Sequence, residues 1–537
     1  MIILGLHGGV TVGQHEPAAA LAINGRIVAA CEEERYLRVK SAYGHLPYYA
    51  ILACLKIANI RFEDIDCVVT PGVTYDDFAE RIRDYLRHNF GSCPKLERVH
   101  HHKAHLASAF YASGFEESIC LSLDAAGDGA SGMLAYATRK DGIRILEKVP
   151  TENSLGYFYT LMTYYLGFAD GDEYKVMGLA PYGKPNIDLS RMIHPSKDGW
   201  VFDWSFVRSE PPPRSPFEPL YSSAVAKLLG HPNRTPGGPM TDYYRDVARS
   251  TQHMTEECVL SLVNALQARV PDSRNLCYTG GLALNCSVNR RLLYSQKFDN
   301  VYVSPVSSDR GLAIGCAYLG AVMAGDQPWQ LWDAYLGSSY SSEEIRKELS
   351  ANGCGFKEVN DPAEVGAGLI AESKIVGWFQ GRSEAGARAL GNRSIIASAR
   401  DENMRDLVNA RIKYREEFRP FAPSVLQEES EQFFFTAGAD HAYMCFTCDV
   451  QPKMADSIRA VVHVDGTARV QTVRSSNNEI YYDLIRKYKQ KSGIPAILNT
   501  SFNLKGQPIV ETPRDALMTF YGCGLDALIM GNFVVSK

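Results

Sequence analysis

Two hairpins turned at glycine, about a hundred residues apart, constrain the fold more than any other feature of the sequence. In the first, the expected strands Ala18–Ile23 and Ile27–Cys31 flank the turn Asn24-Gly25, and an apolar strand ending at Leu6 precedes them. An Asn-Gly pair between apolar runs is a strong signal for a β-hairpin. In the second, the expected strands are Ile119–Leu123, Met133–Thr138 and Ile143–Glu147. The repetition indicates a duplicated unit with a nucleotide cleft between its halves.

The length and the spacing of the elements predict more than one domain. A chain of 537 residues exceeds the size at which a single core usually stops growing. Apolar runs stop near 326–362, so we expect a first domain at 1–340, a linker at 341–362 and a second domain at 363–537. Within the first domain, helical periodicity is clear at 47–58, 104–112 and 243–269, and the proline-rich stretch 205–240 predicts a surface excursion. The second has expected strands at Ile375–Phe379, Ala496–Leu498 and Ala527–Met530 and an expected helix at 401–416.

Charge and composition exclude several classes of partner. The net charge of −5 argues against nucleic acid, since proteins that bind the phosphate backbone usually present a clustered basic face. We find no signal peptide and no run of about 18 apolar residues, so no membrane association is expected. Thirteen cysteines lie scattered through apolar runs, which is typical of reduced thiols in a cytoplasmic protein.

Two nucleotide-binding signatures are present in spacing only. Residues 127–132 match Gly-x-Gly-x-x-Gly, but an expected strand follows them where a dinucleotide site requires a helix. Residues 178–184 have Walker A spacing, but Pro185 replaces the magnesium-binding hydroxyl and Pro181 removes a cradling N–H group. We therefore reject a Rossmann site and a P-loop. A hairpin that faces phosphate, as in actin-like ATPase folds, fits the first motif better.

Two histidines and two aspartates are candidates for a metal site. His101 and His105 are four residues apart at the start of an expected helix, so they share one face and can reach one ion. Asp124 ends the first strand of the second hairpin, and Asp309 precedes another expected helix. A solvated histidine cluster is the alternative interpretation. Two imidazoles with two carboxylates suit iron, manganese or zinc better than calcium.

A double glycine is a candidate for nucleotide contact. Gly280 and Gly281 follow an expected strand and precede a helix near Asn285. Glycine lets the backbone approach a nucleotide closely, and the start of a helix offers free N–H groups. A plain tight turn explains the same residues equally well.

The strongest signal lies between Gly381 and Pro423. There the pattern Gly-Arg-x-Glu-x-Gly-x-Arg-Ala-Leu-Gly-x-Arg-Ser sets glycines at fixed offsets between arginines, Arg388 among them. Glycine permits an anion to approach, and arginine binds phosphate or carbamate through two N–H groups. Asp465–Arg469 adds a further arginine, and Leu498–Asn503 adds a polar cluster at the end of a strand.

With these motifs, the chain resembles the carbamoyltransferase family of nodulation protein U, the cephem O-carbamoyltransferase and the tobramycin carbamoyltransferase. The resemblance runs almost from end to end. It is most specific in the arginine–glycine pattern, in Ile412-Lys-x-Arg-Glu-x-Phe-Arg-Pro-Phe-Ala-Pro423, in Leu498-Asn-Thr-Ser-Phe-Asn503 and in residues 172–183. It implies an α/β (α+β) fold in which an actin/Hsp70-like (ASKHA) ATPase domain is fused to a YrdC-like domain.

The resemblance also implies a reaction. The YrdC-like domain would turn carbamoyl phosphate and ATP into carbamoyl-adenylate, and the first domain would transfer the carbamoyl group to a hydroxyl of a small natural product, as in antibiotic biosynthesis. Iron is favoured at the metal site, with magnesium accompanying ATP. Lys40 matches a residue that contacts the adenylate, and His15 matches the histidine beside the acceptor. The activation site is matched by Arg388, Lys413, Arg419, Arg469, Ser501 and Asn503, next to Asn499.

Two other functions remain open. A small-molecule kinase of the ASKHA class would use the hairpins and the Gly280-Gly281 turn, but it leaves the histidine pair and the second domain without a role. A non-catalytic partner in tRNA threonylcarbamoyl modification is disfavoured by the acidic balance of the chain and by the reactive side chains in both domains.

Overall fold

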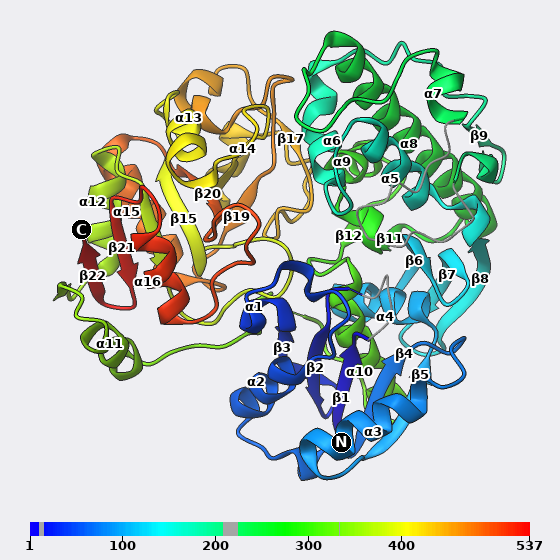
Figure 1. Ribbon diagram of the computed structural model, residues 1–537, viewed down its shortest axis with the longest axis horizontal. Helices are drawn as coiled ribbons and strands as arrows, with labels where there is room; N and C mark the ends of the chain where they lie inside the picture. The colour runs from blue at the N-terminus through cyan, green and yellow to red at the C-terminus, as the bar shows by residue number, and fades with distance from the viewer. Residues whose placement is uncertain (10–14, 208–223, 332) are drawn as a thin grey trace. The chain divides into compact units, whose positions relative to one another are not determined.

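The computed structural model in Figure 1 describes residues 1–9, 15–207, 224–331 and 333–537 and has a mixed α/β fold. The chain forms two compact units, and each gathers several segments. The first unit contains Met1–Gln14, Ala22–Arg26 and Glu63–Gln330, and the second contains His15–Leu21, Ile27–Phe62 and Leu331–Lys537. The domain limits and the linker at 341–362 remain a prediction. The expected excursion at 205–240 lies partly outside the described residues.

Both expected hairpins are confirmed. β1 (Ile2–His7) precedes β2 (Ala18–Ile23) and β3 (Arg26–Glu32), and the turn residues Asn24 and Gly25 both have positive φ angles. The second set consists of β6 (Glu117–Gly127), β7 (Ala130–Thr138) and β8 (Gly142–Pro150), which pair antiparallel. A strand therefore follows the Gly-x-Gly-x-x-Gly motif, and the rejection of a Rossmann site is confirmed.

Two five-stranded sheets have the same strand order. One is β3-β2-β1-β4-β5, with β4 at Cys67–Pro71 and β5 at Lys95–Val99; the other is β8-β7-β6-β11-β12, with β11 at Asn275–Thr279 and β12 at Asn300–Val303. In each sheet the first strand is central and is followed outward by two parallel strands. β1 and β6 therefore occupy corresponding positions.

Helices α4 (His101–Ser113) and α10 (Leu312–Met323) pack on these sheets and on each other. α10 lies against β1 and β4, and α4 lies against β6 and β11. Residues Leu312–Ala321 of α10 are all buried, as expected for a helix that is apolar on every side. A Cβ at Gly315 would lie 1.8 Å from the carbonyl oxygen of Ala104. The missing side chain therefore lets the two backbones touch.

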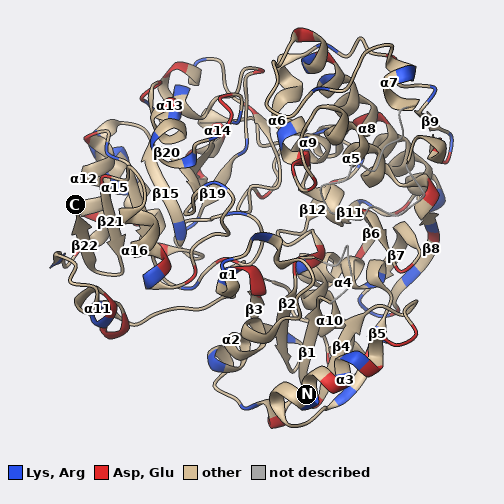
Figure 2. Cartoon of the chain, in the orientation of Figure 1, with Lys and Arg blue, Asp and Glu red and all other residues tan. Residues whose placement is uncertain are grey.

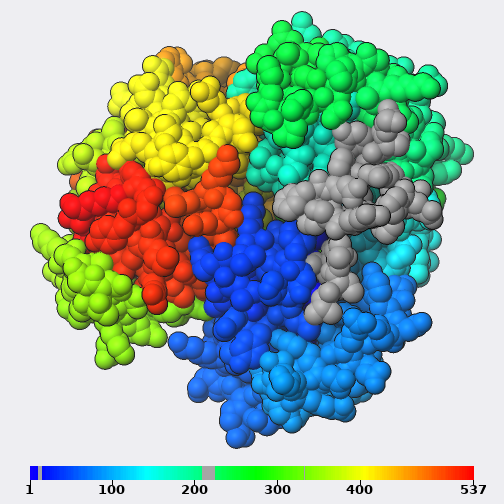
Figure 3. Space-filling model, in the orientation of Figure 1, coloured from blue at the N-terminus to red at the C-terminus, as the bar shows by residue number. Residues whose placement is uncertain are grey.

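The remaining elements of the first unit surround this centre. Charged side chains of both signs alternate along α3 (Phe78–Phe90), which lies at the surface (Figures 2 and 3). α6 (Glu173–Leu179) covers the start of the Walker-like stretch, so the rejection of a P-loop is confirmed. The other elements are α5 (Leu155–Tyr165), β9 (Ile193–Ser196), β10 (Gly199–Phe202), α7 (Ala224–Leu229), α8 (Asp242–Arg269) and α9 (Cys286–Tyr294).

An eight-stranded mixed sheet forms the centre of the second unit. The strands expected near Ile375, Ala496 and Ala527 are confirmed within it. Its order is β13 (Phe356–Glu358), β22 (Phe533–Ser536), β21 (Ala527–Met530), β14 (Val376–Phe379), β15 (Arg393–Ser398), β20 (Ala496–Ser501), β16 (Ala422–Leu426) and β19 (Gln471–Val473). A two-stranded ribbon pairs β17 (Cys448–Asp449) with β18 (Thr467–Ala468).

Helices cover this sheet. α12 (Pro362–Ala371) packs on α15 (Glu479–Ser492), with Trp378 and Leu484 fully buried in the core. α11 (Ser342–Ala351) begins with a capping box between Ser341 and Glu344. The second unit also contains α1 (Glu33–Leu37), α2 (Tyr48–Ala58), α13 (Met404–Val408), α14 (Ser430–Phe433) and α16 (Pro513–Tyr521).

The helix expected at 401–416 is shorter than its pattern predicts. α13 ends at Val408 and continues as a π-helical turn, Asn409–Lys413, and Tyr414 then has a φ of 45°. π-Helical turns are rare and are found mostly at functional sites. The periodicity of charges in 401–416 could not predict the switch from α-helix to π-helix. That switch depends on the hydrogen bonds of Lys413 to residues far away in the chain.

Among the helices that the structure describes, not even the 28-residue α8 is apolar enough to cross a bilayer. All thirteen cysteines are thiols.

Replacing Gly315 by alanine should separate α4 from α10. Because the added Cβ would meet a backbone oxygen that cannot rotate away, we expect a loss of at least about 1–3 kcal/mol in the free energy of unfolding, the usual cost of overpacking a core. Urea denaturation followed by circular dichroism measures it. Met323→Ala, on an exposed side chain of the same helix, is the control and should change stability by less than about 0.5 kcal/mol. Equal stability of Gly315→Ala and wild type would contradict this packing.

Candidate functional site

The start of α4 is fixed by a carboxylate in the turn between β6 and β7. Asp128 accepts hydrogen bonds from the backbone N–H of His101 at 2.8 Å, of Gly72 at 3.1 Å and of Thr74 at 3.1 Å. Burial opposes ionisation of Asp128, but these hydrogen bonds outweigh it and lower its pKa. The same turn that resembles a dinucleotide motif therefore positions the first turn of α4.

The four predicted metal ligands converge in the first unit. His101, His105, Asp124 and Asp309 each offer one ligand atom, and these four atoms lie within 4.8 Å of one another. Nε2 of His105 lies 3.2 Å from Oδ2 of Asp124 and 3.4 Å from Oδ1 of Asp309. Nε2 of His101 lies 3.5 Å from the same Oδ1. α4 supplies the two imidazoles, β6 supplies Asp124, and the turn before α10 supplies Asp309.

The chemistry of this group fits a cation. Nε2 of His101 and both ring nitrogens of His105 are buried without a hydrogen-bond partner, although carboxylate oxygens stand 3.2–3.5 Å away. Buried polar atoms normally have partners, so nitrogen and oxygen lone pairs that face one point indicate a shared positive charge. Two imidazoles and two carboxylates match the ligand types of iron, manganese and zinc.

The protonation states agree with that interpretation. Burial lowers the pKa of His101 to about 4. Burial would also lower the pKa of His105, but the two adjacent carboxylates raise it to about 9. Burial opposes the ionisation of Asp309, yet the imidazoles, led by His101, hold its pKa well below its usual range. At neutral pH the four side chains thus carry a net negative charge that attracts a cation, and an ion that takes His105 as a ligand must displace its proton.

Glycines seat two of these ligands. A Cβ at Gly127 would lie 2.3 Å from Cγ of His101, so only glycine leaves room for that imidazole. Gly281 donates its N–H to Oδ2 of Asp124 at 2.9 Å, and Asp124 Oδ1 accepts the N–H of Ala125 at 2.7 Å. The Gly280-Gly281 turn therefore holds a carboxylate, and the N–H of Gly281 is already used.

Asn285, the third residue predicted near a nucleotide, caps a helix. Its Oδ1 accepts the N–H of Val288 at the start of α9, and its amide pairs with that of Gln252. The sequence pattern located the start of a helix correctly. Which polar groups at the start of α9 stay available for a ligand depends on contacts with α8, because Gln252 of α8 pairs with Asn285.

Two further histidines belong to this region. His102 is buried, with Nδ1 2.8 Å from Oγ of Ser122 and Nε2 3.0 Å from the carbonyl of Ala130. Burial, followed by the charge of His101, lowers its pKa to about 3. His102 is therefore neutral, and it connects α4 to β6 and β7 through these two contacts. His7, at the end of β1, lies beside Asp309. Sequence reasoning missed His7 because no spacing relates it to the other ligands.

The arginine–glycine pattern of the second unit folds around a carboxylate. Oε1 of Glu384 accepts the N–H groups of Leu390, Asn392 and Arg393 at 2.7, 2.8 and 3.2 Å. Arg393 donates to backbone carbonyls of 338, 380, 381 and 392, and its guanidinium lies 3.8 Å above the ring of Phe379. Arg382 donates to the carbonyls of 28, 336 and 337. These two arginines hold the loop, and Arg388 remains the anion-binding candidate of the pattern.

Lys413 meets the end of β20. Its Nζ donates to the carbonyl of Asn503 at 3.0 Å and to Oδ1 of Asn503 at 2.8 Å, and it also contacts the carbonyl and Oγ of Ser501. Burial, and then the positive charges of Arg415 and Arg419, lower the pKa of Lys413 well below its usual range; its oxygen partners favour the charged form. The π-helical turn is what directs Lys413 inward. The structure therefore brings Lys413, Ser501 and Asn503 together.

The other predicted activation residues make no hydrogen bond or ion pair with Lys413, Ser501 or Asn503 that the structure records. Arg419 lies 3.9 Å from Glu416 and is 23% exposed. Arg388 and Arg469 are partly buried. Asn499 is fully buried, and its Nδ2 donates to the carbonyl of Ala389, to Ser424 and to Gln471. Asn499 thus links β20 to the arginine–glycine loop.

His15 and Lys40 lie on two loops that are bound to each other. The N–H of Glu16 donates to the carbonyl of Ser41 at 2.7 Å, and the ring of His15 lies 5.5 Å from that of Tyr43. Glu16, Ser41 and Ala42 have positive φ angles. Such strain in non-glycine residues clusters at functional sites. Glu34 holds the loop of Lys40, since it accepts the N–H of Ser41 at 2.7 Å.

Residues 172–183 contain α6 and a short 3-10 turn, Ala180–Tyr182, and include one unusual carboxyl group. Glu173 accepts a hydrogen bond from Oγ1 of Thr160 at 2.9 Å. Burial raises the pKa of Glu173 to about 7, so it is partly neutral near physiological pH. Nothing in the spacing of the sequence indicated this.

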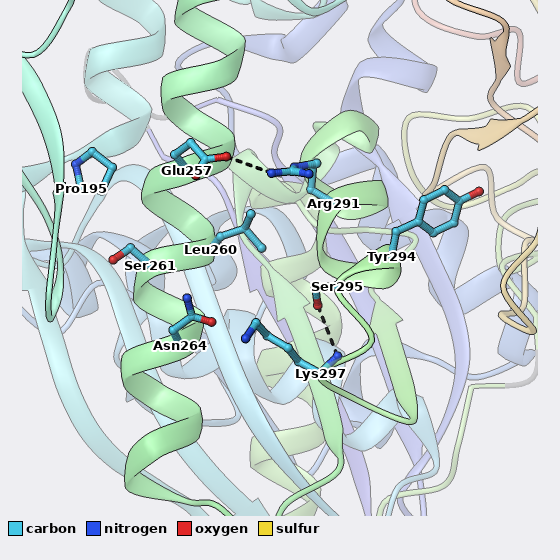
Figure 4. Close-up of a pocket in the computed structure, with 9 residues that line it drawn as sticks. All are labelled: Pro195, Glu257, Leu260, Ser261, Asn264, Arg291, Tyr294, Ser295 and Lys297. Carbon is cyan, nitrogen blue, oxygen red and sulfur yellow. Dashed lines mark hydrogen bonds and ion pairs between the residues drawn. The ribbon is translucent and has the colours of Figure 1, made fainter.

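A groove of about 450 Å³ runs between α8 and α9. Figure 4 shows that Arg291 reaches across it to Glu257, at 2.9 Å. None of the predicted site residues lines it. The clustered ligands lie elsewhere, with the two histidines buried and the two aspartates partly buried.

Comparison with known proteins identifies the family of the chain. Residues 74–318 match the family described as "Carbamoyltransferase N-terminus", and residues 367–537 match "Carbamoyltransferase C-terminus". Nodulation protein NolNO of Sinorhizobium fredii is 34% identical over all of this chain and 83% of its own length. The chain belongs to the carbamoyltransferase family. Nodulation protein NolO of Bradyrhizobium diazoefficiens is 38% identical over 82% of this chain and 79% of its own length.

Solved structures give weaker similarity to this carbamoyltransferase. The activator of the 2-hydroxyisocaproyl-CoA dehydratase from Clostridium difficile has a TM-score of 0.37 at 15% identity, covering 60% of this chain and 96% of its own. HypF of T. kodakarensis has a TM-score of 0.33 at 14% identity, covering 61% and 48%.

Replacing Glu173 by glutamine should stabilise the protein at high pH only. The folded-state pKa of about 7 exceeds the ordinary value, so wild-type stability falls as pH rises from about 4.5 to 7 and then levels. Glutamine has no charge to bury and can still accept from Thr160. We expect a gain of roughly 1–3 kcal/mol at pH 8 and none at pH 4.5, measured by urea denaturation. A gain that is equal at both pH values would contradict the raised pKa.

Proposed function

We propose that this carbamoyltransferase is an ATP-dependent O-carbamoyltransferase that forms carbamoyl-adenylate and transfers its carbamoyl group to a hydroxyl of a small natural product. The single observation that carries the proposal is the convergence of His101, His105, Asp124 and Asp309 on one point in a member of this family. Carbamate is a poor electrophile, and adenylation gives it a good leaving group. A cation centre can then stabilise the charge that develops during transfer.

The activation step is assigned to residues 363–537, which we propose to be YrdC-like. Carbamoyl phosphate, ATP and water would give carbamoyl-adenylate, pyrophosphate and phosphate. The cluster of Lys413, Ser501 and Asn503 supports this assignment, because a buried lysine beside oxygen acceptors can hold a phosphate or carbamate oxygen. Arg388, Arg419, Arg469 and Asn499 complete the proposed site.

The transfer step is assigned to the actin/Hsp70-like (ASKHA) part at 1–340. The acceptor hydroxyl oxygen would attack the carbamoyl carbon, AMP would leave, and His15 would take the hydroxyl proton. Lys40 would contact the adenylate, while Gly280, Gly281 and Asn285 would shape the nucleotide side. The strained loops around Glu16 and Ser41 support a functional role for His15 and Lys40.

The ion proposed at His101, His105, Asp124 and Asp309 is iron, with manganese or zinc as alternatives. When bound, such an ion supplies Lewis acidity toward a carbonyl or phosphate oxygen. Magnesium would accompany ATP. The thirteen thiols support a cytoplasmic site of action.

Mass spectrometry of reaction products tests the proposal. Purified protein receives ATP, carbamoyl phosphate, iron(II) and a panel of sugars, aminoglycosides, cephems, macrolides and lipo-oligosaccharides. A carbamoylated product that requires both ATP and carbamoyl phosphate is the expected result. A phosphorylated product formed without carbamoyl phosphate would identify a kinase instead, and binding of tRNA at physiological salt without any product would favour a partner in tRNA modification.

Removing both imidazoles should remove the ion. We expect His101→Ala combined with His105→Ala to lower the metal content from about one ion per chain to background, because two of four ligands are lost. Elemental analysis of the purified protein measures this, and circular dichroism checks the fold. His100→Ala is the control: this histidine caps α4 but does not belong to the ligand group, so the ion should stay. Equal metal in the double variant and wild type would disprove the centre.

Variants should separate activation from transfer. Lys413→Ala removes a charge-assisted contact worth about 1.5–3 kcal/mol, so we expect carbamoyl-phosphate-dependent pyrophosphate release to fall roughly tenfold to more than a hundredfold. The same variant should still carbamoylate the acceptor when it receives synthetic carbamoyl-adenylate. His15→Ala should behave in the opposite way, with normal pyrophosphate release and little product.

Both variants failing both assays would indicate one shared site and contradict this division of roles. Normal transfer by His15→Ala from supplied adenylate would refute the role of His15 alone. Lys505→Ala, on an exposed lysine two residues after Asn503, is the control for loss of a positive charge and should be active in both assays.

A further inference from the structure

The two oxygens of Asp309 face different histidines. Oδ1 lies 3.5 Å from Nε2 of His101 and 3.4 Å from Nε2 of His105, both predicted ligands. Oδ2 lies 3.5 Å from Nε2 of His7. The carboxylate therefore has one oxygen on the side of the metal site and one on the side of β1.

His7 reaches this position through close packing of β1 on α10. It is the last residue of β1, and its side chain is only 6% exposed. A Cβ at Gly5 would lie 2.0 Å from the carbonyl of Ala313 in α10, so glycine lets the strand lie directly against the helix. Asp309 belongs to the turn that precedes α10. The packing that brings β1 to α10 thus brings the imidazole to the carboxylate.

The repeated topology gives His7 a counterpart. β1 and β6 are the central first strands of two sheets with the same order. β6 contributes Asp124, a predicted ligand, and β1 contributes His7. Asp124 also has its outer oxygen, Oδ1, held by a neighbour, the N–H of Ala125 at 2.7 Å. The corresponding oxygen of Asp309 is Oδ2, which faces His7. Among the described residues, no backbone N–H donates to it.

His7 is distinct from the ligands themselves. The four atoms that can share one ion come from His101, His105, Asp124 and Asp309, and no atom of His7 is among them. A group that contacts a ligand and not the ion acts by orienting that ligand. Such partners commonly change metal affinity by about 10–100-fold.

We propose that His7 is a positioning residue that holds Oδ2 of Asp309, so that Oδ1 alone is presented to the ion. This inference rests on the proposed metal centre. Without His7, the carboxylate is free to rotate or to offer both oxygens, and a ligand that is less well oriented binds more weakly. The centre would keep its four ligands and lose affinity.

Binding of cobalt(II) to the metal-free full chain tests the proposal. Affinity is measured by competition with a chelator, and the ligand field is followed by visible absorption. We expect His7→Ala to weaken binding about 10–100-fold, to keep one ion per chain and to change the absorption bands. His7→Gln, whose Nε2 can take the place of the imidazole Nε2, should recover most of the affinity. His88→Ala, on an exposed histidine of α3, is the control and should match wild type.

Each other outcome overturns the inference in a recognisable way. Unchanged affinity and spectrum in His7→Ala would remove the positioning role and leave the centre intact. Complete loss of binding in His7→Ala and in Asp309→Ala alike would make His7 a ligand. Wild-type protein that binds no cobalt, or binds it equally well without His101 and His105, would refute the centre itself. Should His7→Ala fail to fold, His7→Asn replaces it, because its shorter amide does not reach Oδ2.

Discussion

The contact between α4 and α10 is the constraint on which the first unit depends. Gly315 lets the carbonyl of Ala104 approach within a distance that no side chain permits. α4 carries both ligand histidines, and the turn before α10 carries Asp309. The backbone contact therefore sets the distance between imidazoles and carboxylate. Ligands from different elements can share an ion only if those elements are held rigidly.

The contact between α4 and α10 also buries charged side chains. Taking two carboxylates and an imidazolium out of water is costly unless opposite charges or hydrogen bonds compensate. Both oxygens of Asp124 accept an N–H group, Oδ1 that of Ala125 and Oδ2 that of Gly281, and Asp309 has His7 beside its Oδ2. Nε2 of His101 and both ring nitrogens of His105 keep no hydrogen-bond partner. The cluster is thus incomplete by itself, and a divalent ion would satisfy all four ligands at once.

The second unit uses charge differently. Arg382 and Arg393, which the sequence pattern suggested for anion binding, donate to backbone carbonyls, and Glu384 accepts three N–H groups of the same loop. Most charges of the pattern therefore fold the loop. Lys413 lies outside that pattern, and its Nζ reaches side-chain oxygens of Ser501 and Asn503 as well as their carbonyls. The residues that fold this loop and the residues proposed to act in the site are of the same types, so only their contacts distinguish them.

The sequence by itself determined the hairpins, because Asn24-Gly25 and the alternation of apolar residues act locally. It also determined that His101 and His105 share a helical face, and motif spacing was enough to suggest the family. It could not distinguish Arg388 from Arg393, find His7 or Glu173, or predict the early end of the helix at 401–416. Those properties depend on contacts between residues far apart in the chain, such as the pair His7 and Asp309. Local propensity contains no information on such contacts, so only the tertiary structure decided them.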